Sequence, residues 1–411
     1  MTSTGDLSLG SFGHHLREQF LLDRRCLSLN HGSYGTCPRT VSEELHKYQD
    51  KVEKWPDQWI RRELQAEWDK ARAALAQFVN ADVDEIAFIP NSVTGLNAVL
   101  KSLDCENGDK ILFLSTLSES VRACLNCIKD LNNGKISLIE VDVLYPLSDE
   151  EIIKRTERII EEEKLKPDSR IKAAVIDAIS STPDGTHAIG QIPLDMKDMD
   201  PDYFVTDCHK WLYASRGTAM LYLPHRNQEN IHHAVVTEYY NKGFQLEFSW
   251  GSSQDFSSYL TIHSSLAFRN SLGGESAIQS YCNSLALLGG KLIAAILNTE
   301  VIGPEHTIKH MVNIRLSIPS NHPTFDEQKY DLLMFDKYRC YLALFKHNGW
   351  WCVRASAQIY NDLQDFGSQE KHCSRYVNCT QYHLEGADMT ISIRIYLWRK
   401  ESTSVVFIHI F

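Results

Sequence analysis

Along the first half of the chain, short apolar runs alternate with longer stretches that have a helical period. The apolar runs are rich in β-branched and aromatic residues, which is typical of buried strands. Helices are expected at Val41–Phe78, with an interruption at Pro56, at Ser92–Leu103 and at Glu150–Glu163. Strands are expected at Asp84–Phe88, Lys110–Leu114, Ile136–Val141, Ala173–Asp177, Tyr203–Thr206 and Met220–Leu223. This alternation predicts an α/β fold in which helices cover a mostly parallel sheet.

The pattern changes in the second half of the chain. Residues 257–273 and 275–296 read as helices, and beyond residue 300 strands and helices are mixed, which predicts a smaller α+β C-terminal domain. From Gly367 onward there is little helical period, and the very end is apolar. We therefore expect four parts: an N-terminal segment at 1–30, a large domain at 31–290, a small domain at 291–366 and an atypical tail at 367–411.

Composition narrows the class of protein. The 411 residues are 43% hydrophobic and 23% charged with a formal net charge of −11, which argues against nucleic acid or an anionic membrane as partner. No basic and apolar leader opens the chain, so we expect a cytoplasmic protein whose eleven cysteines are reduced thiols. Cys124 and Cys127 form a C-x-x-C without a second pair. We expect both in the helix core and predict no metal site.

Four stretches carry candidate chemistry, and each has an ordinary alternative. In V-T-D-C-H-K-W-L (205–212), Lys210 taken alone reads as a surface charge. The strand-to-helix turn I-P-N-S-V-T-G-L-N (89–97) is a phosphate cradle or a plain helix cap. In D-G-T-H-A-I-G-Q (184–191), the aspartate could hold a ring nitrogen protonated or merely form a turn. The arginine of W-C-V-R-A-S-A-Q-I-Y (351–360) binds a substrate carboxylate or makes a structural ion pair.

Taken together, the four stretches supply what pyridoxal phosphate chemistry requires. That cofactor needs a lysine for its Schiff base, donors for its phosphate, an acid for its pyridine nitrogen and an arginine for the substrate carboxylate. The coincidence of all four in one chain is far less probable by chance than each feature alone. The sequence therefore predicts a pyridoxal 5′-phosphate enzyme.

The chain resembles the class V aminotransferase family of fold-type I pyridoxal phosphate enzymes. It is most similar to the branch with isopenicillin N epimerase, cysteine desulfhydrases, hercynylcysteine sulfoxide lyases and loline-cluster aminotransferase-like enzymes. The shared motifs occur in family order from about residue 12 to about residue 366. They are L-N-H-G-S-Y-G-T-C-P, N-S-V-T-G-L-N, D-G-T-H-A-I-G-Q-I-P-L-D, D-C-H-K-W-L with R-G, F-S-W-G-S-S-Q-D and V-R-A-S-A-Q-I-Y-N.

The resemblance implies a role for each matching position. Lys210 would be the Schiff-base lysine and would move the proton at Cα, while Asp184 would pair with the pyridine nitrogen and His187 would sit by the ring. Residues Val93, Thr94 and His209 would hold the phosphate, and Ser253 would reach the phosphate of a neighbouring subunit. The substrate would meet Asn30, His31 and Arg354, with Arg354 on its α-carboxylate. The contact across subunits implies a homodimer.

The chain also departs from the family pattern at four places. V-I-D-A-I-S-S-T-P (175–183) runs directly into Asp184, although a parallel crossover needs about a dozen residues, so one βα unit is expected to be missing near 183–184. Ser118 stands where an aromatic ring usually stacks on the cofactor, and Asp207 replaces an uncharged residue beside the phosphate. The fourth departure is the tail.

The expected function is a lyase or transferase reaction on a small L-amino acid or a cysteine conjugate. By resemblance to the branch, β-elimination of a sulfur leaving group, as in C–S lyases and desulfhydrases, is favoured. An aminotransferase or epimerase of fungal-type secondary metabolism is the alternative within the same chemistry. A catalytically impaired or truncated paralogue is the alternative that the departures suggest.

Overall fold

The computed structural model describes residues 12–177, 187–323 and 325–368. Within these ranges the strands form three sheets, with the strand orders β1-β6-β5, β3-β2-β4 and β7-β8-β10-β9. The strands are β1 (Ile86–Ile89), β2 (Asp109–Leu114), β3 (Ile136–Val141), β4 (Arg170–Val175), β5 (Phe204–Thr206), β6 (Ala219–Tyr222), β7 (Val301–Ile302), β8 (Met311–Pro319), β9 (Ala343–His347) and β10 (Trp350–Ser356).

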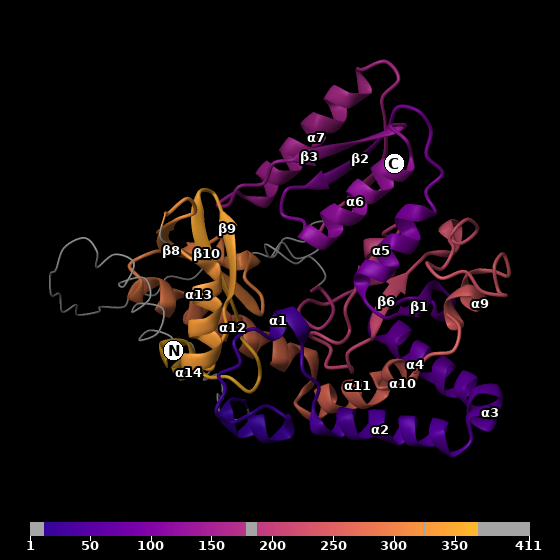
Figure 1. Ribbon diagram of the computed structural model, residues 1–411, viewed down its shortest axis with the longest axis horizontal. Coiled ribbons are helices and arrows are strands. Elements are labelled where there is room, and N and C mark those ends of the chain that lie inside the picture. The colour runs from indigo at the N-terminus through magenta and orange to yellow at the C-terminus, as the bar shows by residue number, and fades with distance from the viewer. Residues whose placement is uncertain (1–11, 178–186, 324, 369–411) are drawn as a thin grey trace, which may run out of the picture.

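Helices surround the three sheets, as Figure 1 shows. The N-terminal helices α2 and α4 pack with α10 and α11 along one side of the sheet that contains β1, and α7 packs on β3 and β4. The helices are α1 (His31–Tyr34), α2 (Arg39–Lys54), α3 (Pro56–Gln58), α4 (Leu64–Phe78), α5 (Ser92–Lys101), α6 (Glu119–Leu131), α7 (Asp149–Lys164), α8 (Met196–Met199), α9 (Phe244–Ser249), α10 (Ser257–Leu260), α11 (Ile262–Ser271), α12 (Gly274–Ile296), α13 (Glu327–Leu332) and α14 (Leu363–Ser368). The predicted α/β fold is confirmed.

The second sheet is parallel, as predicted, because β2 pairs in parallel with both β3 and β4. Strand β4 begins earlier than the sequence pattern suggested. Arg170 stands opposite Asp109 in the register, and its Nε donates a 2.7 Å hydrogen bond to the Asp109 carboxylate. Because Asp109 pairs with it, the charged Arg170 can stand at the start of β4. Hydrophobic periodicity alone does not reveal such a polar first residue.

Helix α6 packs one apolar face against this sheet. Its buried residues recur at the spacing of a helix face and are Val121, Cys124, Leu125 and Ile128. The expectation that both cysteines of the C-x-x-C belong to the core is wrong for Cys127, which is exposed. Three residues beyond Cys124, the helix has turned Cys127 to the flank that faces solvent.

Strands β4 and β5 are the facing edges of two sheets. Among the described strands, β4 pairs only with β2, and β5 pairs only with β6, which runs antiparallel to it. Both strands line one cavity of about 270 Å³, which α5 covers with apolar side chains. The βα unit predicted to be missing would fall at residues 178–186, which lie outside the described residues, so its absence stays a prediction.

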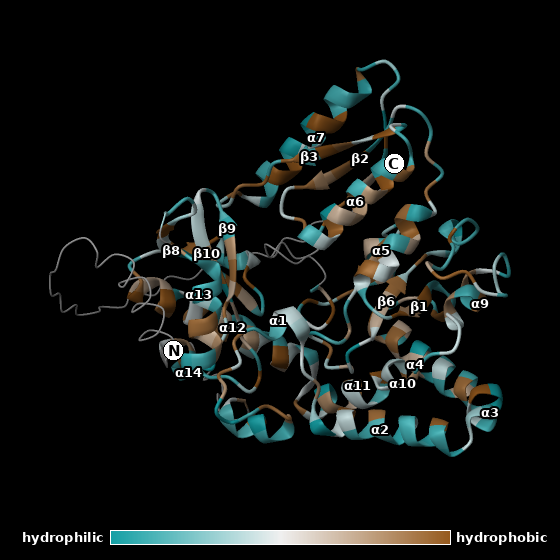
Figure 2. Cartoon of the chain, viewed as in Figure 1, coloured by the Kyte–Doolittle hydropathy of each residue, from teal (hydrophilic) through white to brown (hydrophobic). Residues whose placement is uncertain are grey.

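The third sheet is antiparallel and forms the core of the predicted smaller α+β unit. Strand β8 alternates buried and half-buried residues, and α12 packs across it. Figure 2 shows apolar residues along the strands, whereas polar residues dominate the outer side of helices such as α2. None of the helices in the described ranges combines the length and hydrophobicity that a membrane span requires.

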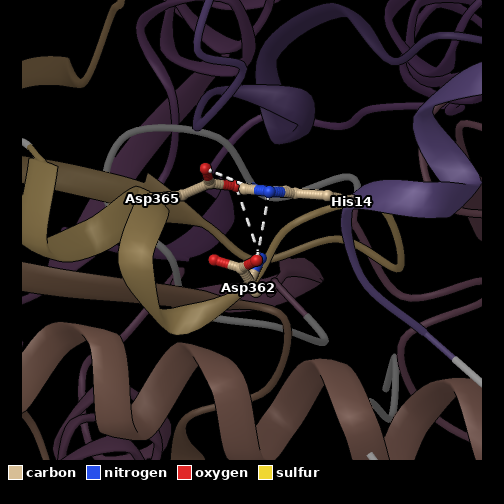
Figure 3. A group of neighbouring side chains, drawn as sticks. All are labelled: His14, Asp362 and Asp365. Atoms are coloured by element: carbon tan, nitrogen blue, oxygen red, sulfur yellow. Dashed lines mark hydrogen bonds and ion pairs between the residues drawn. The ribbon is translucent and has the colours of Figure 1, made fainter. Parts of the chain in front are cut away.

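His14, near the start of the described residues, contacts α14 and the residue that precedes it (Figure 3). His14 Nε2 lies 2.7 Å from Asp365 Oδ1, and His14 Nδ1 lies 3.2 Å from Asp362 Oδ2. Asp365 also accepts a 2.8 Å hydrogen bond from the Asn361 amide. These contacts bring together two segments about 350 residues apart in the sequence.

The turn at Gly190 fixes the backbone that follows β5. Gly190 has a φ of +83°, and a Cβ there would lie 2.6 Å from the Trp211 carbonyl oxygen. We predict that Gly190→Ala lowers the free energy of unfolding by about 3 kcal/mol, because steric overlap adds to the cost of the left-handed backbone. Urea unfolding measures this change.

Gly134→Ala is the matched control. Gly134 has a similar φ of +80°, but nothing lies within 4 Å of the position of its Cβ. We expect this control to lose only about 1 kcal/mol, the cost of the backbone conformation alone. Equal losses in the two variants would show that the Gly190 turn does not pack on Trp211 as described.

Candidate active site

Lys210 lies in the connection between β5 and β6, and its side chain is buried at 5% exposure. Its Nζ lies 3.2 Å from Asp207 Oδ2 and lines the cavity of about 270 Å³ between β4 and β5. A buried amine of this kind is unfavourable without a polar partner, and the Asp207 carboxylate is such a partner. The surface-charge alternative for Lys210 is therefore wrong.

Helix α5 begins beside the same cavity, which Asn91, Ser92 and Val93 at its start help to line. Val93 lines the cavity together with His209 and Lys210. Asn91 caps the helix, because its Oδ1 accepts hydrogen bonds from the Thr94 N–H at 2.9 Å and the Thr94 hydroxyl at 3.1 Å. The start of α5 is thus both a capped helix end and a site that favours an anion.

Asp207 already places a carboxylate at this helix end. Its Oδ1 accepts a 2.8 Å hydrogen bond from the Ser92 N–H, while its other oxygen faces Lys210. The sequence alone suggested that a carboxylate here would have to be protonated or turned away from a phosphate. The structure shows it turned toward the helix and the lysine, where both partners favour its negative charge.

His187 is buried next to Trp211, the residue that follows Lys210 in the sequence. His187 is 1% exposed, and its Nδ1 accepts a 3.0 Å hydrogen bond from Trp211 Nε1. Since Nδ1 accepts, a neutral His187 carries its proton on Nε2. Asp184, expected to meet a pyridine nitrogen, lies outside the described residues.

His31 holds the Lys210 backbone in place. Its Nε2 donates a 2.8 Å hydrogen bond to the Lys210 carbonyl oxygen, and its Nδ1 accepts a 3.0 Å hydrogen bond from the Tyr360 hydroxyl. Nearby, a Cβ at Gly35 would overlap the His209 carbonyl oxygen, so only glycine allows α1 to approach this closely. Burial lowers the pKa of His31 to about 4.

Arg354 and Asn30 meet through a residue that sequence reasoning missed. Ser33 Oγ accepts a 3.0 Å hydrogen bond from Arg354 Nη2 and donates a 2.8 Å hydrogen bond to Asn30 Oδ1. Arg354, on β10, is 1% exposed. Ser33 lies in the motif L-N-H-G-S-Y-G, next to the predicted residues Asn30 and His31, and this position in the motif could have indicated its role.

The site consists of two connected spaces. Arg354 lines a cleft of about 640 Å³ between the large unit and β9. That cleft and the Lys210 cavity share the residues Ser33, Ser118 and Ser120. Ser118 stands at the position where the family usually has a stacking aromatic ring. Its hydroxyl caps α6 by accepting a hydrogen bond from the Val121 N–H. A small molecule in the shared region can therefore reach Lys210 at one end and Arg354 at the other.

Ser253 is not part of this connected space. It lines a separate cleft beside α3 and α4, together with Trp68 and Trp250. The sequence assigned Ser253 to a neighbouring subunit's phosphate, and the single chain leaves that role a prediction. Within one chain the structure thus brings together Val93, His209 and Lys210, and, in the adjoining cleft, Arg354.

Comparison with known proteins identifies the class of this site. Residues 170–332 match the class V aminotransferase family. The hercynylcysteine sulfoxide lyase of Schizosaccharomyces pombe is 26% identical over 390 residues, covering 86% of this chain and 95% of the relative. The L-cysteine desulfhydrase-like protein lolT2 of Epichloe uncinata is also 26% identical, with coverages of 86% and 91%. The L-cysteine desulfhydrase of Arabidopsis thaliana is 27% identical, covering 70% of each chain.

Solved structures support the same assignment at the level of the fold. A complex of the cystine C–S lyase C-DES with its product cysteine persulfide has a TM-score of 0.70 at 16% identity, covering 85% of this chain and 98% of that one. The apo cysteine desulfurase of Thermococcus onnurineus NA1 has a TM-score of 0.71 at 14% identity, with coverages of 90% and 98%. Over residues 170–332 the chain is similar to the class V aminotransferase family, and its fold is the fold-type I architecture of these solved structures, as predicted.

The described residues fit pyridoxal phosphate, the cofactor of this family. Lys210 offers a buried amine, and the start of α5 with Val93 and His209 offers an environment for a phosphate. The apolar side chains of α5 and β5 suit the face of an aromatic ring. Asp207 opposes the phosphate charge at the start of α5, and Asp177 is a second carboxylate that lines the same cavity.

Buried His31 makes the stability of the protein depend on pH. Its pKa is about 4 in the folded state and about 6.5 in the unfolded state, so only the unfolded chain takes up a proton as the pH falls. Between pH 7 and pH 5, we predict that wild type loses about 2 kcal/mol more unfolding free energy than His31→Gln. Urea unfolding of both proteins at pH 7, 6 and 5 measures this difference. Parallel pH dependences would contradict a buried neutral His31.

Proposed function

We propose that the chain is a pyridoxal-phosphate-dependent C–S lyase that acts on cysteine or a cysteine conjugate. The observation that carries the proposal is the connected space with buried Lys210 at one end and buried Arg354 at the other. The relatives named cysteine desulfhydrase and hercynylcysteine sulfoxide lyase support this function over transamination or epimerisation, which have no better support.

Arg354 and Lys210 act on different parts of the substrate. Arg354 takes the α-carboxylate, because a planar guanidinium binds a carboxylate through two parallel hydrogen bonds, and Ser33 fixes its orientation. When bound, pyridoxal phosphate supplies an electron sink that acidifies the Cα proton. The Lys210 amine would remove that proton as the Cβ–S bond breaks, and the resulting Lys210 ammonium would protonate the departing thiolate. Water would then hydrolyse the released enamine to pyruvate and ammonia.

Asp207 occupies the place beside the lysine and the helix end. Its carboxylate lies 3.2 Å from the Lys210 Nζ. An anionic phosphate arriving at the start of α5 would compete with Asp207 for the Ser92 N–H. We infer that Asp207 weakens cofactor binding relative to an uncharged residue.

We further propose a homodimer. Leu246, which lines the same cleft as Ser253, is 47% exposed, and Trp55, next in sequence to Pro56 of that cleft, is 64% exposed. Apolar exposure of this extent on neighbouring elements is typical of an interaction surface. Sedimentation equilibrium of the purified protein would measure the mass of the assembly.

We predict that Lys210→Ala abolishes the visible absorption that the parent protein develops with pyridoxal phosphate. The parent should also release pyruvate from L-cysteine or S-alkylcysteines without a keto acid, and the variant should be at least about a thousandfold slower. Lys197→Ala, at an exposed lysine, is the matched control and should behave as the parent. A requirement for a keto acid would indicate transamination instead, and an unchanged band in Lys210→Ala would exclude Lys210 as the cofactor lysine.

We also predict that Asp207→Asn binds pyridoxal phosphate about tenfold more tightly than the parent. The asparagine keeps an oxygen for the Ser92 N–H but removes the charge that repels the phosphate. Titration of the visible band gives the dissociation constant, with Asp130→Asn on the exposed side of α6 as control. Weaker binding by Asp207→Asn would mean that the carboxylate supports the cofactor rather than opposing it.

A further inference from the structure

Arg269 is a buried cation that the reaction described above does not use. It lies in α11 with an exposure of 1%, and it lines neither the Lys210 cavity nor the cleft beside Arg354. A guanidinium stays charged at every pH at which proteins fold, so its burial requires a counter-charge and acceptors for its N–H groups. The atoms that accept these hydrogen bonds indicate the role of the residue.

The counter-charge is Glu275, in the first turn of α12. Arg269 Nε donates a 2.5 Å hydrogen bond to Glu275 Oε1, and Arg269 Nη2 donates one of 2.6 Å to Glu275 Oε2. This two-bond geometry is the one in which a guanidinium binds a carboxylate most strongly. The guanidinium carbon also lies over the Tyr213 ring, 4.9 Å from its centre. These contacts balance the buried charge.

The guanidinium also binds two backbone carbonyl oxygens beside the active site. Arg269 Nη1 donates a 2.5 Å hydrogen bond to the Trp211 oxygen, and Arg269 Nη2 donates one of 3.1 Å to the Gly190 oxygen. Trp211 directly follows Lys210, and Gly190 closely follows His187. One planar cation therefore joins the segment that carries the lysine to the segment that carries the histidine.

Trp211 links the same two segments through its side chain as well, because its Nε1 donates a 3.0 Å hydrogen bond to His187 Nδ1. The Gly190 backbone packs so closely here that a Cβ at this position would lie 2.6 Å from the Trp211 oxygen. Carbonyl oxygens that are brought to one place carry partial charges of the same sign, and a shared cation offsets their repulsion. Arg269 thus stabilises this junction at the point where the two segments meet.

Resting on the proposed function, we propose that Arg269 is a positioning residue for the lyase reaction. By binding both carbonyl oxygens, it fixes the placement of the Lys210 amine relative to the His187 ring, although the two groups come from different segments. It acts through these segments and not by contact with the substrate. A small displacement of a reacting group lowers the rate of the chemical step strongly, even when ligands still bind.

The alternative is an ion pair that only joins α11 to α12. Both explanations predict a loss of stability when Arg269 is replaced, but they differ for the folded variant. A purely structural pair would leave the affinity for pyridoxal phosphate and kcat as in the parent, whereas loss of a positioning residue changes both. Substrate affinity depends mainly on Arg354 and its cleft, which Arg269 does not line, so kcat should fall at nearly constant KM.

The test is Arg269→Lys, measured on protein whose folding is verified by circular dichroism. Lysine keeps the charge for Glu275 but has three N–H donors for four oxygen atoms, and it lacks the planar fork. We expect the dissociation constant for pyridoxal phosphate, from titration of the visible band, to rise about fivefold because the site is less preorganised. For pyruvate release from L-cysteine at saturating cofactor, kcat should fall about thirtyfold and KM should change less than about threefold.

Arg170→Lys is the matched control. The Arg170 guanidinium makes the same kind of two-bond pair, with buried Asp109 at 2.7 and 3.0 Å, but it stands at the start of β4 and lines neither space of the active site. This control should lower the urea midpoint as Arg269→Lys does and leave the dissociation constant and kcat unchanged. Equal losses of cofactor affinity and kcat in the two variants would overturn the assignment of Arg269.

Gly190→Ala disturbs the same junction without removing the cation, and it decides the question if Arg269→Lys does not fold. It should lower kcat at least about tenfold at nearly constant KM, whereas Gly134→Ala should keep the parental kinetics. A parental kcat in folded Gly190→Ala would contradict the proposed positioning of Lys210 and His187.

The outcomes also separate this inference from the proposed function. A folded Arg269→Lys with the parental dissociation constant and kcat would overturn the inference and leave the lyase function intact. Absence of pyruvate from a parent protein that binds pyridoxal phosphate through Lys210 would overturn the lyase function. In that case the dissociation constants of parent, Arg269→Lys and Arg170→Lys would still test the role of Arg269.

Discussion

The burial of Lys210 beside Asp207 is the interaction on which the rest of the site depends. A charged lysine with almost no exposure requires a nearby carboxylate, and that carboxylate in turn needs the Ser92 N–H at the start of α5. The lysine, the acid and the helix end therefore form one electrostatic unit. A ligand that brings its own anion to the start of α5 would therefore affect all three members together.

The backbone around Lys210 is held by segments that are far apart in the sequence. His31 from α1 bonds to the Lys210 carbonyl oxygen, and Tyr360 beyond β10 bonds to His31. Ser33 links the same N-terminal turn to Arg354. The N-terminal turn thus connects the carboxylate-binding arginine to the lysine, and a change in any of these contacts would alter the distance between the two ends of the site.

Much of the fold could be predicted from the sequence, because hydrophobic periodicity marks strands and helices directly. Ile136–Val141 was predicted at its observed bounds, whereas β4 was placed too late because its first residue, Arg170, is polar and paired. Cys127 was assigned to the core because spacing alone does not say where an apolar face ends. Lys210, His209 and Val93 were recognised because their chemistry is encoded in local motifs. Ser33 and Tyr360 were missed because their roles arise from contacts about 330 residues apart.

Chemical trapping would show whether Lys210 carries the cofactor. The purified protein would be incubated with pyridoxal phosphate and reduced with borohydride, and the modified peptide would be located by mass spectrometry. We expect a single phosphopyridoxyl group on the peptide that contains Lys210. Modification confined to other lysines, or no stable modification, would contradict it.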